Sequence, residues 1–115
     1  MARKISGGKY KKSRKTKKYE RMGNITYVTL GKERKKQIRV MGGNTKIIMF
    51  SADKANVKGK DGKIKAVKIK SVVQVPSNRY LKGIMFKGSI IDTELGKAKI
   101  TNRPSQEGMI NAALI

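Results

Sequence analysis

Several residue types on which protein chemistry often depends are missing from this chain of 115 residues. It has no cysteine and no histidine. These absences exclude disulfides and thiolate metal sites, and they remove the commonest general base and the best side-chain nucleophile. No run of 18 apolar residues occurs and no apolar stretch follows the basic N-terminus, so the sequence predicts neither a membrane span nor a signal peptide.

Acidic residues are also scarce. Seven Asp and Glu face 29 Lys and Arg, which gives a formal net charge of +22. Self-repulsion of this size destabilises a compact state unless an anionic partner relieves it. The composition therefore predicts a polyanionic partner, and no small-molecule substrate.

The few carboxylates offer little for catalysis. Asp92 and Glu94 lie two residues apart and form a possible catalytic pair. A solvated hairpin edge beside nearby lysines explains them more simply, because no third group supports a reaction. Their spacing with Asp53 matches no metal-binding loop. We expect a protein that is not an enzyme and that holds no metal ion and no cofactor.

Positive charge is what the N-terminus has in abundance. Residues 1–23 hold ten Lys or Arg against one acid, a net charge of +9. Their four sizeable apolar side chains are too few to offset backbone entropy of about 1–2 kcal/mol per residue. We expect a basic, extended arm that is disordered without RNA. Its predicted RNA-binding cations are Arg3, Lys4, Lys9, Lys11, Lys12, Arg14, Lys15, Lys17, Lys18 and Arg21.

Residues 24–115 show short β-rich runs separated by Gly, Asn, Asp and Pro, which predicts one β domain. The expected strands are 25–30, 37–40, 46–51, 64–75, 84–86, 89–93, 97–101 and 109–115. A hairpin tip is expected at 57–63, a helical turn or loop at 78–80 and a loop at 104–108. The predicted fold class is all-β: a small antiparallel β-barrel of about six to seven short strands, with a sandwich as the alternative.

The segment 64–75 is the clearest of these strands. Its residues alternate between a predicted apolar face, which consists of Val67, Ile69, Ser71, Val73 and Val75, and a largely polar one. The lysines on the polar face either line a solvated surface or contact phosphate, and the sequence leaves both interpretations open.

A second cationic group flanks a turn at Gly42-Gly43-Asn44. Plain turn geometry is one explanation of the glycines, but we favour a second one, in which exposed amides beside Arg39 and Lys46 let an RNA backbone approach closely. The predicted RNA-binding residues of the β domain are Lys35, Lys36, Arg39, Gly43, Asn44, Lys46, Arg79 and Arg103. Specific phosphate or base-edge contacts are expected of the bidentate guanidinium groups of Arg3, Arg14, Arg39 and Arg103.

Several stretches are similar to a known family. Residues 39–46, Arg-Val-Met-Gly-Gly-Asn-Thr-Lys, resemble the central motif of ribosomal protein S8e in its short archaeal form. The similarity continues through 6–8, 17–20, 52–57, 87–98, 103–108 and 111–115. In one departure, Glu20-Arg21-Met22-Gly23 is one residue longer than the corresponding family pattern.

The resemblance implies a constituent of the small ribosomal subunit in the cytoplasm, bound to ribosomal RNA beside neighbouring ribosomal proteins, with a barrel-like body and an extended N-terminus. The residues alone leave open a general nucleic-acid packaging or chaperone protein, which would bind duplex DNA equally well. An RNA-modifying enzyme is a second alternative, and it would need a pocket with clustered carboxylates and a cofactor. A binder of anionic membranes fits poorly, because the arm shows no apolar helical face.

Overall fold

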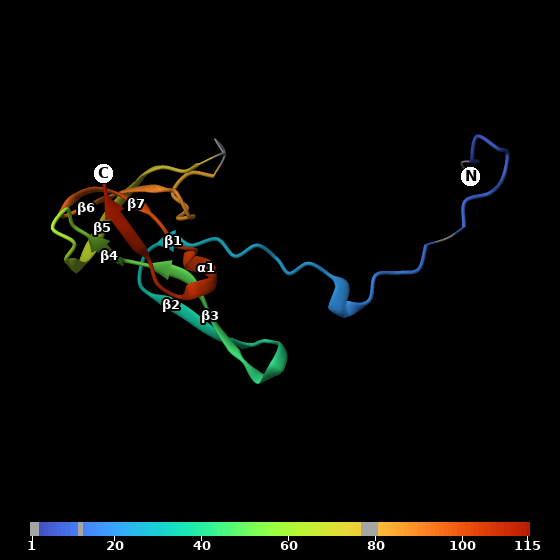
Figure 1. The fold of residues 1–115 in the computed structure, drawn as a ribbon, viewed down its shortest axis with the longest axis horizontal. Helices are drawn as coiled ribbons and strands as arrows, with labels where there is room; N and C mark the ends of the chain where they lie inside the picture. Colours follow the sequence, from blue (N-terminus) through green and yellow to red (C-terminus); the bar gives the residue numbers. More distant parts are fainter. Residues whose placement is uncertain (1–2, 12, 77–80) are drawn as a thin grey trace.

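The computed structural model describes residues 3–11, 13–76 and 81–115. Over these residues the chain forms eight strands and one turn of α-helix, preceded by a long extended segment (Figure 1). The all-β prediction is confirmed. Lys12, Arg79 and the segment expected at 78–80 lie outside the described residues.

Five of the strands close into a barrel. They are β4 (Lys54–Lys58), β5 (Ile64–Gln74), β6 (Ile90–Thr93), β7 (Gly96–Ile100) and β8 (Asn111–Leu114). Neighbours pair antiparallel in this order, and β8 closes the ring by pairing parallel with β4. The expected barrel is present, with five strands where the sequence suggested six or seven.

The other three strands form a separate sheet in the order β1-β3-β2. They are β1 (Thr29–Leu30), β2 (Arg34–Arg39) and β3 (Thr45–Ala52). The β2–β3 hairpin projects from the body and ends at a 3₁₀ turn, Met41–Gly43 (Figure 1). The chain passes from β3 into β4 through Asp53, whose carbonyl accepts the N–H of Ile69 at 2.8 Å. This bond ties the sheet to the barrel.

Some expected elements differ from those observed. β4 lies in a stretch for which the sequence predicted no strand, and its end overlaps the start of the expected hairpin tip at 57–63. The expected strand at 84–86 is reduced to a single bridge between Ile84 and Thr29. The expected loop at 104–108 contains the one-turn helix α1 (Pro104–Glu107), which has Pro at its first turn and ends at Gly108 in the left-handed region.

The alternation predicted along β5 holds only for its first half. Val67 and Ile69 are buried as expected. The register then shifts between Ile69 and Ser71 and again between Val72 and Gln74. Such β-bulges reverse which residues face inward, so Val72 packs against the core and Val73 is exposed.

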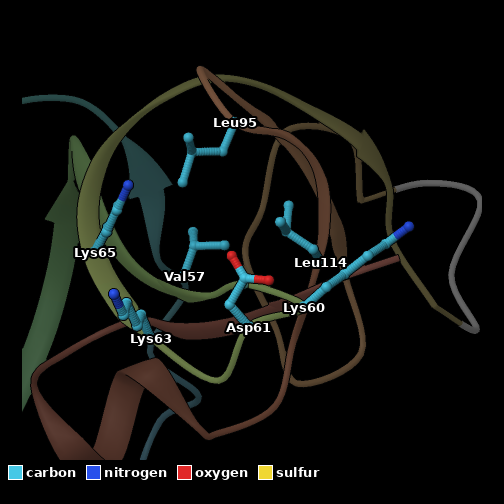
Figure 2. Close-up of a pocket in the computed structure, with 8 residues that line it drawn as sticks. Val57, Lys60, Asp61, Lys63, Lys65, Leu95 and Leu114 are labelled. Atoms are coloured by element: carbon cyan, nitrogen blue, oxygen red, sulfur yellow. The ribbon is translucent and has the colours of Figure 1, made fainter.

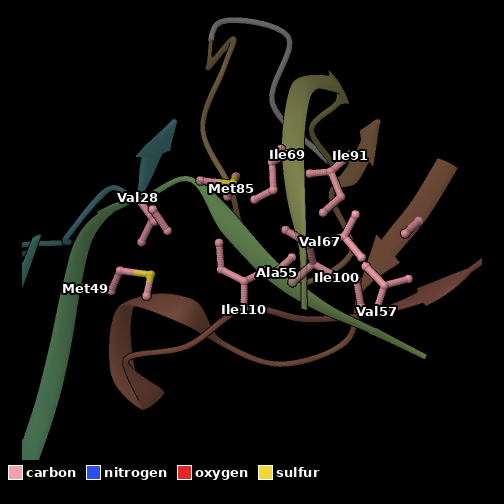
Figure 3. Close-up of a cluster of buried hydrophobic side chains, with 13 residues drawn as sticks. Val28, Met49, Ala55, Val57, Val67, Ile69, Met85, Ile91, Ile100 and Ile110 are labelled. Atoms are coloured by element: carbon pink, nitrogen blue, oxygen red, sulfur yellow. The ribbon is translucent and has the colours of Figure 1, made fainter. Parts of the chain in front are cut away.

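One apolar core joins the barrel to the sheet (Figure 3). Its largest fully buried side chains include Met85, Ile91, Ile100 and Ile110. Val28 and Met49 extend the same cluster toward the sheet. Since one cluster serves both units, the β2–β3 hairpin is attached to the barrel through packed side chains as well as through the chain.

The N-terminal segment gives the molecule an elongated shape. Its principal extents are 67 × 36 × 25 Å and its radius of gyration is 20.2 Å, against about 13 Å for a compact chain of this length. Figure 1 shows the segment leading away from the sheet and barrel. No helix in the described part of the chain has the length and apolarity needed to cross a membrane.

Candidate nucleic-acid interface

The N-terminal arm presents its cations to solvent. Every described residue from 3 to 25 is exposed. The described arm cations are Arg3, Lys4, Lys9, Lys11, Arg14, Lys15, Lys17, Lys18 and Arg21. Because the arm is extended, most of its charges are spread along a line and are accessible to separate anionic groups.

The arm contains two pieces of local structure. Near its start, the backbones of Arg3 and Lys9 form an isolated antiparallel β-bridge. The Lys4 ammonium lies 5.8 Å from the centroid of the Tyr10 ring. Further along, a 3₁₀ turn spans Lys18–Glu20. Both are held by contacts within the arm, so neither depends on the barrel.

The only acid of the arm is already paired. Two nitrogens of the Arg14 guanidinium donate to the two oxygens of Glu20, at 2.9 and 2.5 Å, and the Lys17 N–H donates to the same carboxylate at 3.1 Å. The Arg14 guanidinium and, to a smaller extent, the Lys17 N–H hold the pKa of Glu20 below its usual range. Arg14 was predicted to hold a specific phosphate or base-edge position, and in this structure the Glu20 carboxylate occupies its guanidinium group.

The β2–β3 hairpin is the second cationic projection. Its turn closes through the Val40 N–H, which donates to the Asn44 carbonyl at 2.8 Å. Gly42 and Gly43 both have φ of +75°, a conformation that favours glycine, and no other atom lies within 4 Å of the place of a Gly43 Cβ. The tip is therefore uncrowded at Gly43, and the backbone of a ligand could approach it closely.

Charge on this hairpin is distributed unevenly. Lys35 forms an ion pair with Glu33, and the Arg34 guanidinium lies 5.9 Å from the centroid of the Phe50 ring. Lys36 and Arg39 are exposed on the same strand. The cations nearest the tip are thus Arg39 at the end of β2 and Lys46 at the start of β3.

A pocket of about 470 Å³ brings together cations from three separate segments. We call it the basic pocket, and its lining is Lys46, Lys87, Thr101, Asn102, Arg103, Gln106 and Glu107. Lys46 comes from β3, Lys87 from the loop before β6, and Arg103 from the residue before α1. With one carboxylate against three cations, the pocket has a net charge of +2 and suits an anion.

Hydrogen bonds fix the segment that carries Arg103. The Asn102 amide donates to the Glu107 carboxylate at 3.0 Å and to the Met109 carbonyl at 2.8 Å. Its oxygen accepts the Asn111 N–H at 3.0 Å. Since Asn102 uses both ends of its amide in these bonds, it shapes the α1 segment, and Glu107 is partly committed to it.

Close packing and a backbone bond place the other two cations. Gly108 lies against Ile47, the neighbour of Lys46, so closely that an added Cβ would come within 2.5 Å of the Ile47 side chain. The Gly88 N–H donates to the Ile100 carbonyl at 2.8 Å, which holds the loop beside Lys87. The backbones of all three cations are therefore fixed before any ligand binds.

The sequence-predicted residues divide between these features. Gly43, Asn44 and Arg39 lie at the hairpin tip, whereas Lys46 and Arg103 meet in the basic pocket. Lys87 was missed. It stands before a glycine in a loop, and its proximity to Arg103 depends on long-range folding that no local pattern encodes.

The carboxylates considered for catalysis lie apart from this surface. Asp92 on β6 pairs across the hairpin with Lys97 on β7, and Glu94 is exposed in the turn between them. Among the residues that the structure describes, no group of three acidic, histidine or cysteine side chains is placed to hold a metal ion.

Comparison with known proteins gives matches over the full length. The family model described as "Ribosomal protein S8e" matches residues 1–115. The chain is 47% identical over 116 residues to the small ribosomal subunit protein eS8 of Methanocorpusculum labreanum, covering 98% of this chain and 93% of that one.

Two further archaeal relatives bear the same name. The protein from Sulfolobus acidocaldarius is 46% identical over 118 residues, with 99% of this chain and 92% of the relative covered. The protein from Methanosarcina barkeri is 37% identical over 116 residues, with 98% and 93% covered.

Proposed function

The chain belongs to the ribosomal protein S8e family, and we propose that it is a structural constituent of the small ribosomal subunit. In this proposal it binds ribosomal RNA through the arm, the β2–β3 hairpin and the basic pocket, at the ribosome in the cytoplasm. It lies beside other ribosomal proteins and catalyses no reaction. Its contribution is to neutralise phosphate charge and to fix RNA segments relative to one another.

The extended arm, whose described residues are all exposed, is the observation that carries the RNA-binding part of the proposal. At physiological ionic strength the Debye length is about 8 Å, so a cation acts mainly on phosphates that it nearly touches. An arm of net charge +9 brings many cations into such contact, which a compact domain of equal charge cannot do. Its only acid already pairs with Arg14, so little negative charge is left to oppose RNA.

The body supplies fixed contacts that the arm lacks. The hairpin tip offers Arg39 and an uncrowded Gly43 to an RNA backbone, and the basic pocket offers three cations on fixed backbones. The arm then gives most of the affinity, and the body sets orientation. Specificity comes from the shape and 2′-hydroxyl groups of the RNA.

Salt-dependent binding tests the proposal. If the full chain neutralises about 6–10 phosphates, its affinity for small-subunit ribosomal RNA falls roughly 10³–10⁵-fold between 50 and 200 mM salt, by analogy with duplex DNA. The chain should also sediment with small subunits and leave them only at high salt. Deletion of residues 1–23 should weaken RNA binding strongly while the β domain stays folded.

Duplex DNA of equal length is the matched competitor. A general packaging protein would bind both polymers equally, whereas this proposal requires preference for the ribosomal RNA. Unchanged RNA affinity after deletion of the arm would contradict the role given to it here.

A further inference from the structure

A second pocket, of about 450 Å³, opens at one end of the barrel, and Figure 2 looks into it. We call it the mouth pocket. It is formed by β4, the β4–β5 turn, the start of β5, the β6–β7 turn and β8. Its lining is Val57, Gly59, Lys60, Asp61, Lys63, Lys65, Leu95 and Leu114.

The bottom and one wall of the mouth pocket are aliphatic. Val57 is fully buried beneath it, Leu114 is half-buried, and Leu95 remains 45% exposed. In Figure 2 these three side chains surround the middle of the opening. Covering exposed apolar surface is worth about 25 cal/mol per Å², so a ligand that places an apolar side chain in this opening gains affinity from it.

The rim of the pocket is cationic. Lys60, Lys63 and Lys65 stand around it with Asp61 as the only acid, a net charge of +2. Lys60 and Lys63 lie on a turn closed by two backbone bonds, from Gly59 N–H to the Lys63 carbonyl at 2.9 Å and from Gly62 N–H to the Gly59 carbonyl at 3.1 Å, and Lys65 lies on β5. The backbones that carry these lysines are thus fixed around the aliphatic bottom, and their charges complement a ligand with acidic groups beside an apolar one.

This pocket lies far from the basic pocket. Strand β7 separates them: Leu95, just before it, lines the mouth pocket, and Thr101, just after it, lines the basic pocket. Six residues of extended chain span roughly 20 Å. RNA bound in the basic pocket therefore leaves the mouth pocket open to a different partner.

The lining decides which kind of partner fits. An unpaired base stacks on aromatic side chains or arginine planes, and the mouth pocket is lined by neither. A phosphate would satisfy the lysines but leave the leucines against water. A peptide that carries an apolar side chain between carboxylates satisfies both the bottom and the rim.

We propose that the mouth pocket binds a segment of a neighbouring protein in which an aliphatic or aromatic side chain is flanked by Asp or Glu. The inference rests on the proposed function in one respect: the neighbour is met in the assembled small subunit. The apolar side chain enters between Leu95 and Leu114. The flanking carboxylates pair with Lys63 and Lys65.

Site-specific photocrosslinking in assembled subunits tests this. The full chain carries p-benzoylphenylalanine in place of Leu95, is assembled into small subunits and irradiated, and the crosslinked partner is identified by mass spectrometry. The matched control carries the same group in place of Val73, which is exposed on β5 outside the mouth pocket. We expect the Leu95 position alone to crosslink to a protein segment with acidic residues.

Charge variants refine the test. Lys65→Glu should lower the crosslinking yield about fivefold or more, because it places a carboxylate against the acidic segment. Lys68→Glu, on the same strand but outside the pocket, should leave the yield within about twofold. Crosslinks from the Leu95 position to RNA, or to a protein segment without acidic residues, would overturn the inference. Equal crosslinking yields from the Leu95 and Val73 positions would overturn it as well. Failure of the chain to sediment with subunits would instead count against the proposed function.

Discussion

Gly108 is a position where even a substitution by alanine should lower the stability of the fold. Its φ is +71°, and an added Cβ would lie 2.5 Å from Ile47 Cγ2 and 2.9 Å from Ile47 Cβ. A left-handed backbone costs a non-glycine residue about 1–2 kcal/mol, and overpacking adds about 1–3 kcal/mol. Rotating Ile47 does not remove the clash with its Cβ. We expect Gly108→Ala to lower the free energy of unfolding, measured in urea, by about 2–5 kcal/mol.

Gly62→Ala is the matched control. Gly62 has a similar φ of +77°, but nothing lies within 4 Å of the added Cβ. It should therefore cost only the backbone strain of about 1–2 kcal/mol. Equal decreases in the free energy of unfolding of Gly108→Ala and Gly62→Ala would show that the contact of Gly108 with Ile47 adds nothing to the loss of stability.

The ion pair in the arm predicts a pH dependence. Because the pKa of Glu20 is lowered by Arg14, the turn at Lys18–Glu20 is favoured above the ordinary carboxyl pKa and is lost as pH falls through the lowered one. Arg14→Gln should raise the Glu20 pKa toward its usual value. NMR titration of the Glu20 carboxyl carbon measures this, with Lys18→Gln as the control. A titration that Arg14→Gln leaves unmoved would refute the pairing.

At the scale of the structural elements, the basic pocket, which joins β3, the loop before β6 and the α1 segment, should influence the salt dependence of RNA binding. Removing one cation that neutralises a phosphate makes the slope of log affinity against log salt shallower by about 0.7–0.9. We expect Lys87→Gln and Arg103→Gln each to reduce the slope for ribosomal RNA by up to that amount. Lys65→Gln, at the other end of the barrel, should leave it unchanged. Equal effects of all three would mean that the pocket holds no particular phosphate.

Elements were predictable where local pattern and burial coincide. The first half of β5 follows its alternation, whereas its second half departs from it because bulges shift the register. α1 was missed although Pro104 and Gly108 are its start and stop signals. β4 was missed because turn-forming residues surround Ala55 and Val57, whose burial depends on β5 and β8.

On the scale of the whole molecule, scattering can test the independence of the arm. Deleting residues 1–23 should reduce the radius of gyration from near 20.2 Å to about 12 Å, the value for a compact chain of 92 residues. The urea midpoint of the β domain should change little, since all described arm residues are exposed. A large drop in stability would mean that the arm packs on the body in solution.

Charge asymmetry and an all-β body were predictable for the whole chain because composition and turn residues encode them. The division into barrel and sheet was not. It depends on pairings such as β4 with β8, which join Asn56 to residues far along the chain. The same is true of the basic pocket, whose cations lie on β3, before β6 and before α1.

The parallel pairing of β4 with β8 also has a consequence for synthesis. Asn56 and Asn111, which meet across it, are 55 residues apart, so a nascent chain leaving the exit tunnel cannot complete the ring until residues 111–114 have emerged. Until then β4 and β7 have unpaired edges that other chains can join. The cationic arm emerges before any strand of the barrel, so its cations are already exposed while these edges still lack their partner.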